Sequence, residues 1–362
     1  MKNLLKPSVY WLFAFMPITL WLDYVGHAAP QYIFFCAAIT IIPIAKLIVE
    51  ATEQVAVRTG EAVGGLLNAT FGNAPELIIC IVALKAGLHQ MVLASLIGGI
   101  LANLLLALGV SFLAGGVKFH NQEYSSSGAR IYTSMMLIAV VSMTVPGTFN
   151  RLFGAGDLGE HEQSLNIGLA IVLLATYGLY LVFMLKTHPD VFASPKGNNE
   201  PEEHEEHWSV GRAIITLVVA SVLAAWMSEI LVGAAEGTGE ALGMTPTFIG
   251  LVFLAVVGGA AESLSAITMA RKNKMDLTMG IALGSCIQIA LFIAPLLVLL
   301  SLVIGQGPMF LTFGRTELGC LFLAVLIGAI VSGDGRSNWY KGVQLTMVYI
   351  IIALLFYFMP QV

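Results

Sequence analysis

The sequence predicts an all-α integral membrane protein with eleven transmembrane helices: one leading helix and two inverted five-helix repeats with broken helices at the midplane. Three observations support this fold class. The 362-residue chain is 57% hydrophobic and only 11% charged, far from the roughly 25% charged residues of soluble globular domains. Its mean hydropathy is +0.86. Apolar runs of about 20 residues, long enough to cross the hydrocarbon layer, alternate with short polar loops.

Each predicted span is an apolar run between polar segments. The first follows Met1-Lys2-Asn3 and lacks the small-residue cleavage site of a signal peptide, so we expect it to be retained. In order, the expected spans are 8–26, 31–56, 61–85, 91–115, 130–146, 165–186, 210–236, 245–270, 277–304, 312–332 and 339–359.

The distribution of Lys and Arg predicts the orientation. Loops on the amino-terminal side carry thirteen of these residues, loops on the other side carry three, and Lys46 lies inside a span. Because cytoplasmic loops are enriched in Lys and Arg, the amino terminus should be cytoplasmic and the carboxyl terminus external. No long targeting extension precedes the first span, so we expect a multi-pass protein of a bacterial or archaeal plasma membrane.

One long polar interval, residues 187–208, divides the spans into six and five and contains an acidic run from Glu200 to Glu206. This run is either a solvated tether or a regulatory segment that binds Ca²⁺ or responds to pH. The expected parts are therefore an amino-terminal helix (1–30), a first five-helix repeat (31–186), an acidic cytoplasmic linker (187–208) and a second five-helix repeat (209–362).

The two halves align as internal repeats. At an offset of 179, Glu50 matches Glu229, and after an insertion the offset becomes 186, so that Glu76 matches Glu262. The later matches also pair Gly72, Ala74 and Gly98 with Gly258, Ala260 and Gly284. With five helices per repeat, the second copy enters the membrane from the opposite side, an architecture typical of secondary transporters.

Glu76 and Glu262 lie inside apolar spans, where a charge costs on the order of 3 kcal/mol on insertion scales. No Lys or Arg lies near either of them in its own span, and Lys46 on a neighbouring helix is left open as a partner. Gly72-Asn73-Ala74-Pro75 and Gly258-Gly259 predict helix breaks at the same depth. Such breaks are tolerated only where protein or a water-filled cavity satisfies the backbone. The alternative is a pair of neutral carboxylic acids that serve packing alone.

These groups together suggest a cage of oxygen ligands, which suits Ca²⁺ better than Zn²⁺ or Cu⁺. The same carboxylates can carry protons, so Ca²⁺ and H⁺ would compete for them. For the amides Asn103 and Gln288, helix–helix hydrogen bonding is an equal alternative. The expected metal ligands are Glu76, Glu262, Asn73, Gly72, Gly258, Asn103, Gln288 and Ser285.

Four further carboxylates lie in the spans that precede the acidic breaks. They either line access or gating routes to the site or are interfacial carboxylates near helix ends, and both interpretations stay open. These residues are Glu50, Glu53, Glu229 and Glu236.

Three long motifs carry a family resemblance: Leu67 to Ala74 with Glu76, Gly258 to Glu262, and Asp276 to Phe292. Over nearly its whole length the chain resembles the cation/proton exchanger (CAX) family of the Ca²⁺/cation antiporter superfamily. The resemblance implies Ca²⁺/H⁺ antiport with Glu76 and Glu262 as ion ligands, eleven helices and an acidic cytoplasmic linker. The chain departs from the family pattern at Gly259 and Ser263, where the second motif usually has Asn and His.

Other functions are weighed against this one. Pro75 beside Glu76 is similar to the Pro-Glu of sodium/calcium exchangers, so Na⁺/Ca²⁺ exchange is the alternative, and a cation channel is a weaker one. No Ser–His pair or metal-binding histidine motif lies at membrane depth, so we expect a transporter and not an enzyme. We expect no cofactor and no nucleic-acid partner. The partners are the lipid bilayer and the transported Ca²⁺ and H⁺, and a homo-oligomer is compatible with the sequence.

Overall fold

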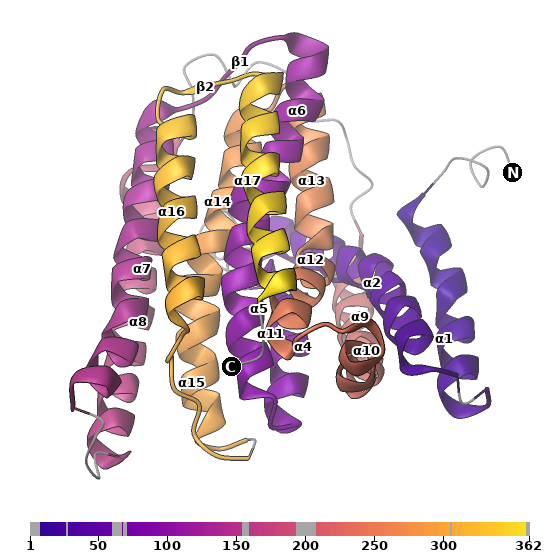
Figure 1. The fold of residues 1–362 in the computed structure, drawn as a ribbon. Coiled ribbons are helices and arrows are strands. Elements are labelled where there is room, and N and C mark those ends of the chain that lie inside the picture. Colours follow the sequence, from indigo (N-terminus) through magenta and orange to yellow (C-terminus); the bar gives the residue numbers. More distant parts are fainter. Residues whose placement is uncertain are drawn as a thin grey trace, which may run out of the picture.

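The structure is a computed structural model that describes residues 8–26, 28–59, 67, 71–153, 159–192, 208–304 and 306–359. Within these residues, eight helices are long and apolar enough to cross a membrane. A ninth span is a bent pair, Pro246–Gly258 and Ala260–Arg271, whose axes differ by 55°. The chain is therefore a multi-pass helical membrane protein, as predicted (Figure 1).

The helices of the first half lie over the predicted spans, but the helix predicted at 130–146 runs on to Phe153 and the one predicted at 165–186 begins at Gly159. The leading span is shorter than expected, and α4 is the described end of the expected span 61–85. The elements are η2 (Val9–Ala14), α1 (Phe15–Tyr24), α2 (Pro30–Thr59), α4 (Ala74–Lys85), α5 (His89–Leu101), η3 (Ala102–Ala107), α6 (Leu108–Phe119), α7 (Ser126–Phe153), α8 (Gly159–Val182), η4 (Phe183–Thr187) and η5 (Pro189–Phe192).

The second half begins after residues 193–207, which include the acidic run and lie outside the described residues. Its elements are α9 (Val210–Gly233), α10 (Ala235–Leu242), α11 (Pro246–Phe248), η6 (Ile249–Leu254), α12 (Ala255–Gly258), α13 (Ala260–Arg271), α14 (Met275–Gln288), η7 (Ile289–Ile293), α15 (Ala294–Ser301), α16 (Arg315–Ser332) and α17 (Trp339–Phe358). The count of eleven spans stays a prediction, because much of 61–85 is not described.

The helix at the centre of the molecule is α5 with its continuation through η3 into α6. Residues 91–105 are all buried. α17 packs directly on α6, and glycines allow this close approach: a Cβ added at Gly342 would lie 2.3 Å from the backbone nitrogen of Leu113. Small residues at such crossings let helix backbones meet within a membrane.

α2 and α9 pack along each other beside this core, and α1 packs on α2 at the edge of the molecule (Figure 1). α2 also contacts α13, and α9 contacts α4. Each of these two long helices therefore touches the helix that carries the acidic residue of the other half.

A short ribbon that the sequence did not predict joins the two halves at one end (Figure 1). β1 (Gln122–Glu123) pairs antiparallel with β2 (Arg336–Ser337). Tyr124 Oη donates to the carbonyl of Ser332 at 3.0 Å, and Gln122 Nε2 donates to the carbonyl of Ala270 at 2.9 Å. The ribbon thus connects the α6–α7 turn to the α16–α17 turn and to the end of α13.

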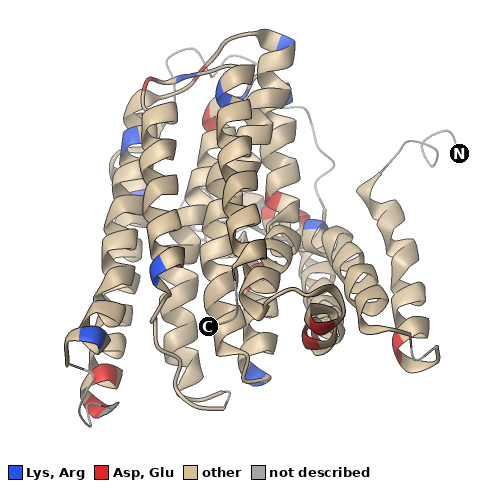
Figure 2. Cartoon of the chain, viewed as in Figure 1, with Lys and Arg blue, Asp and Glu red and all other residues tan. Residues whose placement is uncertain are grey.

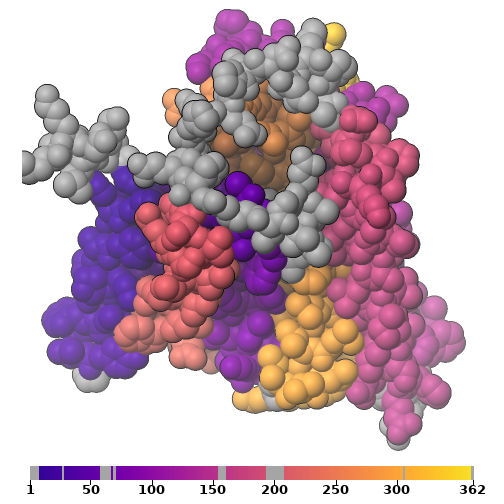
Figure 3. Space-filling view, turned by 180° about the vertical axis from the view of Figure 1, so that it is seen from behind, coloured from indigo at the N-terminus to yellow at the C-terminus, as the bar shows by residue number. Residues whose placement is uncertain are grey.

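Charged residues are sparse along the helices, and most of each helix carries none (Figure 2). Exposed apolar side chains cover the outward faces of α7, α8 and α9, including Val141, Leu179 and Ile215. This pattern is expected for faces that contact lipid. Seen from behind, a hollow opens between α9 and α8, with the orange region of α13 and α14 at its back (Figure 3).

Candidate cation site

The two predicted acidic residues occupy equivalent positions in their helices. Glu76 is the third residue of α4 and Glu262 is the third residue of α13, at the predicted offset of 186. Each side chain is only 7% exposed. The amino-terminal end of a helix carries a partial positive charge, which favours an anion in its first turn. Both helices therefore stabilise the ionised form of the carboxylate that they carry.

Both helices start at the predicted interruptions. Asn73 precedes α4 with φ −93° and ψ 28°, and Gly259 precedes α13 with φ −80° and ψ 6°. Pro75 is the second residue of α4, where its missing amide hydrogen costs nothing. The carbonyls of Asn73 and Gly259 accept from Leu77 and Ser263 at 3.1 and 2.9 Å. These two carbonyls begin the helices, so each is already partly occupied.

Glu76 packs across the break of the other half. A Cβ added at Gly258 would lie 2.8 Å from Glu76 Cγ, and one added at Gly259 would lie 3.3 Å from Glu76 Oε1. The Gly259 position is also 3.7 Å from Asn103 Oδ1. The space that a side chain at residue 259 would use is therefore taken by Glu76 and Asn103.

Glu262 in turn faces the break of the first half. The Asn73 amide lies between Gln288 and Glu262: with its nitrogen toward Gln288, it donates to Gln288 Oε1 at 2.8 Å. With the amide turned over, the nitrogen donates to Glu262 Oε2 at 3.0 Å and to Oε1 at 3.1 Å. An ionised carboxylate only accepts hydrogen bonds, so it favours the second orientation. A protonated or cation-bound Glu262 favours the first, in which the amide oxygen faces it.

Other polar groups lie close to the two carboxylates. Ser285 hydrogen-bonds to Glu262, and the charge of Glu262 repels that of Glu76. Glu76 Oε2 and Asn103 Nδ2 are buried and have no hydrogen-bond partner within the described residues. Unpaired buried polar atoms are costly, so these two atoms are available for an ion or a water molecule.

The two amide-bearing helices change geometry beside the site. Asn103 lies in the π-helical segment η3, and Gln288 is the last residue before the π-helical segment η7. The two segments begin at residues 102 and 289, one residue from the repeat offset. π-helical turns inside α-helices are frequent at functional sites because they redirect side chains.

The predicted ligands thus fall into one cluster with few acidic groups. Glu76, Glu262, Asn73, Gly258, Asn103, Gln288 and Ser285 lie together, with Gly72 in the turn before Asn73. Among the described residues, no group of three or more His, Cys, Asp or Glu side chains is placed so that it could hold a metal ion. Binding of a hard cation here would depend on amide, hydroxyl and backbone oxygens as much as on carboxylates.

The four carboxylates predicted to line access or gating routes, Glu50, Glu53, Glu229 and Glu236, lie outside this cluster. Glu50 accepts from the Tyr10 hydroxyl, and Lys46 Nζ lies 3.5 Å from Glu50 Oε1 and 5.1 Å from the centre of the Tyr10 ring. Lys46, which the sequence left open as a partner of the buried site, therefore pairs with Glu50 one turn away. Glu53 and Glu236 are exposed, and Glu229 lines a separate cavity.

One residue near the site was missed by the sequence reasoning. Tyr177 on α8 is 5% exposed, interacts electrostatically with Glu262, and stacks on Phe292 with ring centroids 5.5 Å apart. Its position in the middle of an apolar span could have marked it as unusual, because tyrosines of membrane proteins are enriched at the membrane–water interfaces.

Comparison with known proteins gives consistent results. The family model described as sodium/calcium exchanger protein matches residues 31–186 and 212–358. A Ca²⁺/H⁺ antiporter of Aphanothece halophytica is 41% identical over 363 residues, covering 97% of this chain and 96% of the relative. The Ca²⁺/H⁺ antiporter ChaA of Bacillus subtilis (strain 168) is 41% identical over 332 residues, covering 91% and 93%. The solved structure of native YfkE has a TM-score of 0.83 at 37% identity, covering 97% of this chain and 100% of that one. The chain belongs to the sodium/calcium exchanger protein family.

Proposed function

We propose that this protein is a secondary active transporter that exchanges Ca²⁺ for H⁺ by alternating access, with Glu76 and Glu262 as the carboxylates that both ions share. The proposal rests on how the two helix breaks pack against each other. Glu76 of the first half lies against Gly258 of the second, and Asn73 of the first half lies against Glu262 of the second. Two buried carboxylates from different halves thereby face one small polar space. The Ca²⁺/H⁺ antiporters at 41% identity support the same choice of ions.

The chemistry of exchange follows from competition for the same oxygens. Ca²⁺ prefers six to eight oxygen ligands, and we propose that these come from Glu76, Glu262, Asn73, Gly72, Gly258, Asn103, Gln288 and Ser285. When protons bind the carboxylates, the charge that attracts Ca²⁺ is lost. Moving a divalent ion out against a potential of 100 mV costs roughly 4.6 kcal/mol, so export requires a driving ion.

The same proposal includes the architecture expected from the sequence. It comprises eleven helices, a leading helix (1–30), inverted repeats (31–186 and 209–362) and a cytoplasmic linker (187–208). Two features support it: the family model matches the chain in two blocks, and α2 and α9 each contact the acidic helix of the opposite half. The bias of Lys and Arg supports a cytoplasmic amino terminus and an external carboxyl terminus, in the plasma membrane.

The test is Ca²⁺ uptake into inside-out vesicles with an imposed pH gradient. Wild type should accumulate Ca²⁺, and Glu76→Gln and Glu262→Gln should each abolish uptake. Glu160→Gln, at an exposed helix start, is the matched control and should transport normally. If wild type failed to couple Ca²⁺ to the pH gradient, the function would be wrong. If it coupled normally and both glutamine variants did as well, only the site would be wrong.

Na⁺/Ca²⁺ exchange is the second candidate, because Pro75 directly precedes Glu76 in the first turn of α4. The two functions separate in one experiment: Ca²⁺ flux driven by a pH jump in Na⁺-free buffer supports H⁺ exchange. Flux that appears only with a Na⁺ gradient supports the alternative. A cation channel would instead give currents that follow voltage and do not require a proton gradient.

A further inference from the structure

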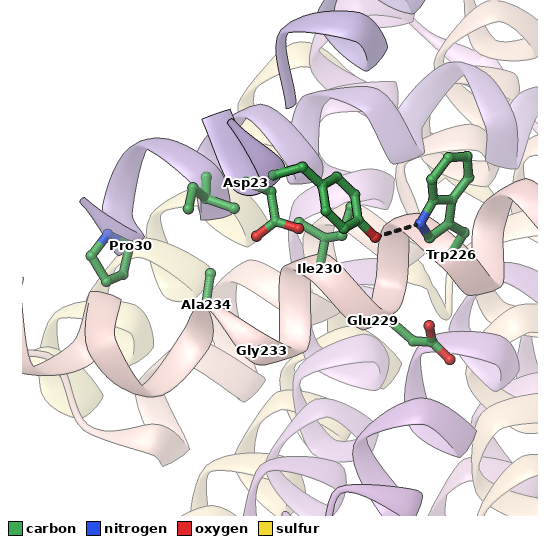
Figure 4. Close-up of a pocket in the computed structure, with 9 residues that line it drawn as sticks. Asp23, Pro30, Trp226, Glu229, Ile230, Gly233 and Ala234 are labelled. Carbon is green, nitrogen blue, oxygen red and sulfur yellow. Dashed lines mark hydrogen bonds between the residues drawn. The ribbon is translucent and has the colours of Figure 1, made fainter. Parts of the chain in front are cut away.

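A separate cavity of about 380 Å³ lies between the end of α1, the start of α2 and the last turns of α9. It is at the end of the molecule opposite the ribbon, beside the leading helix (Figures 1 and 4). Its volume falls within the range of about 300–1,000 Å³ typical of small-molecule sites. None of the proposed Ca²⁺ ligands lines it, so it is distinct from the cation site.

Two aromatic residues form one part of the lining. Trp226 on α9 donates its indole hydrogen to the Tyr24 hydroxyl on α1 over 3.2 Å. The dashed line in Figure 4 marks this bond, which joins the two helices across the cavity. Both residues are exposed, Trp226 at 37% and Tyr24 at 60%. The hydrogen bond holds the rings in place without covering their faces.

Two carboxylates from different helices also line the cavity. Asp23 reaches from the end of α1 towards α9, and the exposed Glu229 projects from the other side of the α9 ribbon in this view (Figure 4). Within the described part of the chain, neither carboxylate forms an ion pair or a hydrogen bond to a cationic side chain. Two negative charges with no internal counter-charge favour a positively charged ligand.

The remaining lining decides which kind of cation fits. Ile33 and Ile230 contribute apolar walls, whereas a partly dehydrated Ca²⁺ would need six to eight oxygen ligands. An organic ammonium group matches the cavity better, because its charge can pair with carboxylates while its carbon atoms contact aromatic and apolar surfaces. Trp and Tyr side chains are also typical of the membrane–water interface, where the amine headgroups of lipids lie.

We propose that this cavity binds an organic ammonium group, with Asp23 and Glu229 as its counter-charges and the Tyr24–Trp226 pair as its aromatic wall. Two sources share this chemistry: the ethanolamine headgroup of a phospholipid and a free small amine. The site is separate from the proposed Ca²⁺ ligands, none of which lines it.

The test measures binding to the full-length purified protein by two routes. Calorimetric titration with ethanolamine is compared with ethylene glycol, which has similar size but no charge. Native mass spectrometry then asks whether protein from mixed nanodiscs retains phosphatidylethanolamine in preference to phosphatidylglycerol. Saturable ethanolamine binding without lipid retention identifies a free amine as the source, and selective retention identifies the headgroup.

The variant Asp23→Asn/Glu229→Gln removes both charges, and binding should weaken by about tenfold or more. The matched control, Glu160→Gln/Asp190→Asn, removes two exposed carboxylates outside the cavity and should bind as wild type. Trp226→Leu keeps an apolar side chain but removes the ring, and should also weaken binding if the protein elutes as a folded species. The proposal would be overturned if neither probe bound, if ethylene glycol bound as well as ethanolamine, or if the double variant matched its control.

Discussion

The side chain of Glu76 rests on Gly258, the last helical residue before the break in the opposite half of the chain: a Cβ at that position would lie only 2.8 Å from Glu76 Cγ. The glycine is therefore required by the carboxylate that lies on it, and the two halves are fitted to each other at this point.

Gly258→Ala should displace Glu76, because a contact under 3.0 Å at Cγ, close to the backbone, cannot be relieved by rotating the end of the side chain. We expect pH-driven Ca²⁺ uptake to fall by about tenfold or more, equivalent to at least about 1.4 kcal/mol. Gly168→Ala is the control, since nothing lies within 4 Å of a Cβ added there. Equal uptake by the two variants would show that the position of Glu76 does not matter.

Asn73→Ala should weaken Ca²⁺ binding, because it removes the amide oxygen that faces a cation-bound Glu262. Ca²⁺ affinity depends on the number of oxygen ligands, so we expect the KM for Ca²⁺ to rise about tenfold, equivalent to about 1.4 kcal/mol. Uptake measured over a range of Ca²⁺ concentrations gives this value. Asn150→Ala loses only an exposed hydrogen bond to Glu162 and should leave KM unchanged; a similar rise in both variants would contradict the assignment.

Ca²⁺ binding should release protons if both ions use Glu76 and Glu262. Affinity measured calorimetrically should therefore rise with pH, and the heat should vary with the ionisation enthalpy of the buffer. Glu262→Gln removes one exchangeable proton and should reduce that buffer dependence. Ca²⁺ affinity that is the same at low and high pH would rule out direct competition.

The ion pair between Asp334, in the α16–α17 turn, and Lys341, in the first turn of α17, should give a small pH-dependent stability. Partial burial acts to raise the pKa of Asp334, but hydrogen bonds from Lys341, at 2.6 and 2.7 Å, and from the Arg336 amide lower it overall. A lowered carboxyl pKa stabilises the fold at neutral pH, and this contribution is lost as pH falls through that pKa.

Lys341→Met should therefore lower Tm at neutral pH by about 2 °C or less, the size expected for an exposed ion pair. The difference from wild type should disappear in acid. Lys85→Met, at an exposed helix end, serves as the control. A difference that persisted unchanged in acid would assign the effect to packing of the lysine stem.

The spans and the helix breaks could be predicted because each has a strong local signal. Long apolar runs located the helices, although α7 extends seven residues past the predicted end at residue 146 and α8 begins six residues before the predicted start at residue 165. Asn73-Ala74-Pro75 and Gly258-Gly259 marked the helix starts. The Lys46–Glu50 ion pair also has a local signal in the sequence, because the two oppositely charged residues are four positions apart on one helix.

Other features had no local signal. β1 and β2 are two residues each, too short to show alternation, and they pair across more than 200 residues of sequence. The Asn103–Gly259 proximity depends on how two helices cross, and no pattern within either helix encodes that crossing. Tyr177 approaches Glu262 from α8 for the same reason.

The ribbon constrains how the molecule can move. It fastens the α6–α7 turn to the α16–α17 turn, and the Gln122 side chain adds the end of α13 to the same junction. The two halves are therefore held together at that end of the molecule. We expect rearrangements that admit or release ions to leave this junction closed and to be carried by the helices that lie away from it, α1, α2 and α9 (Figure 1).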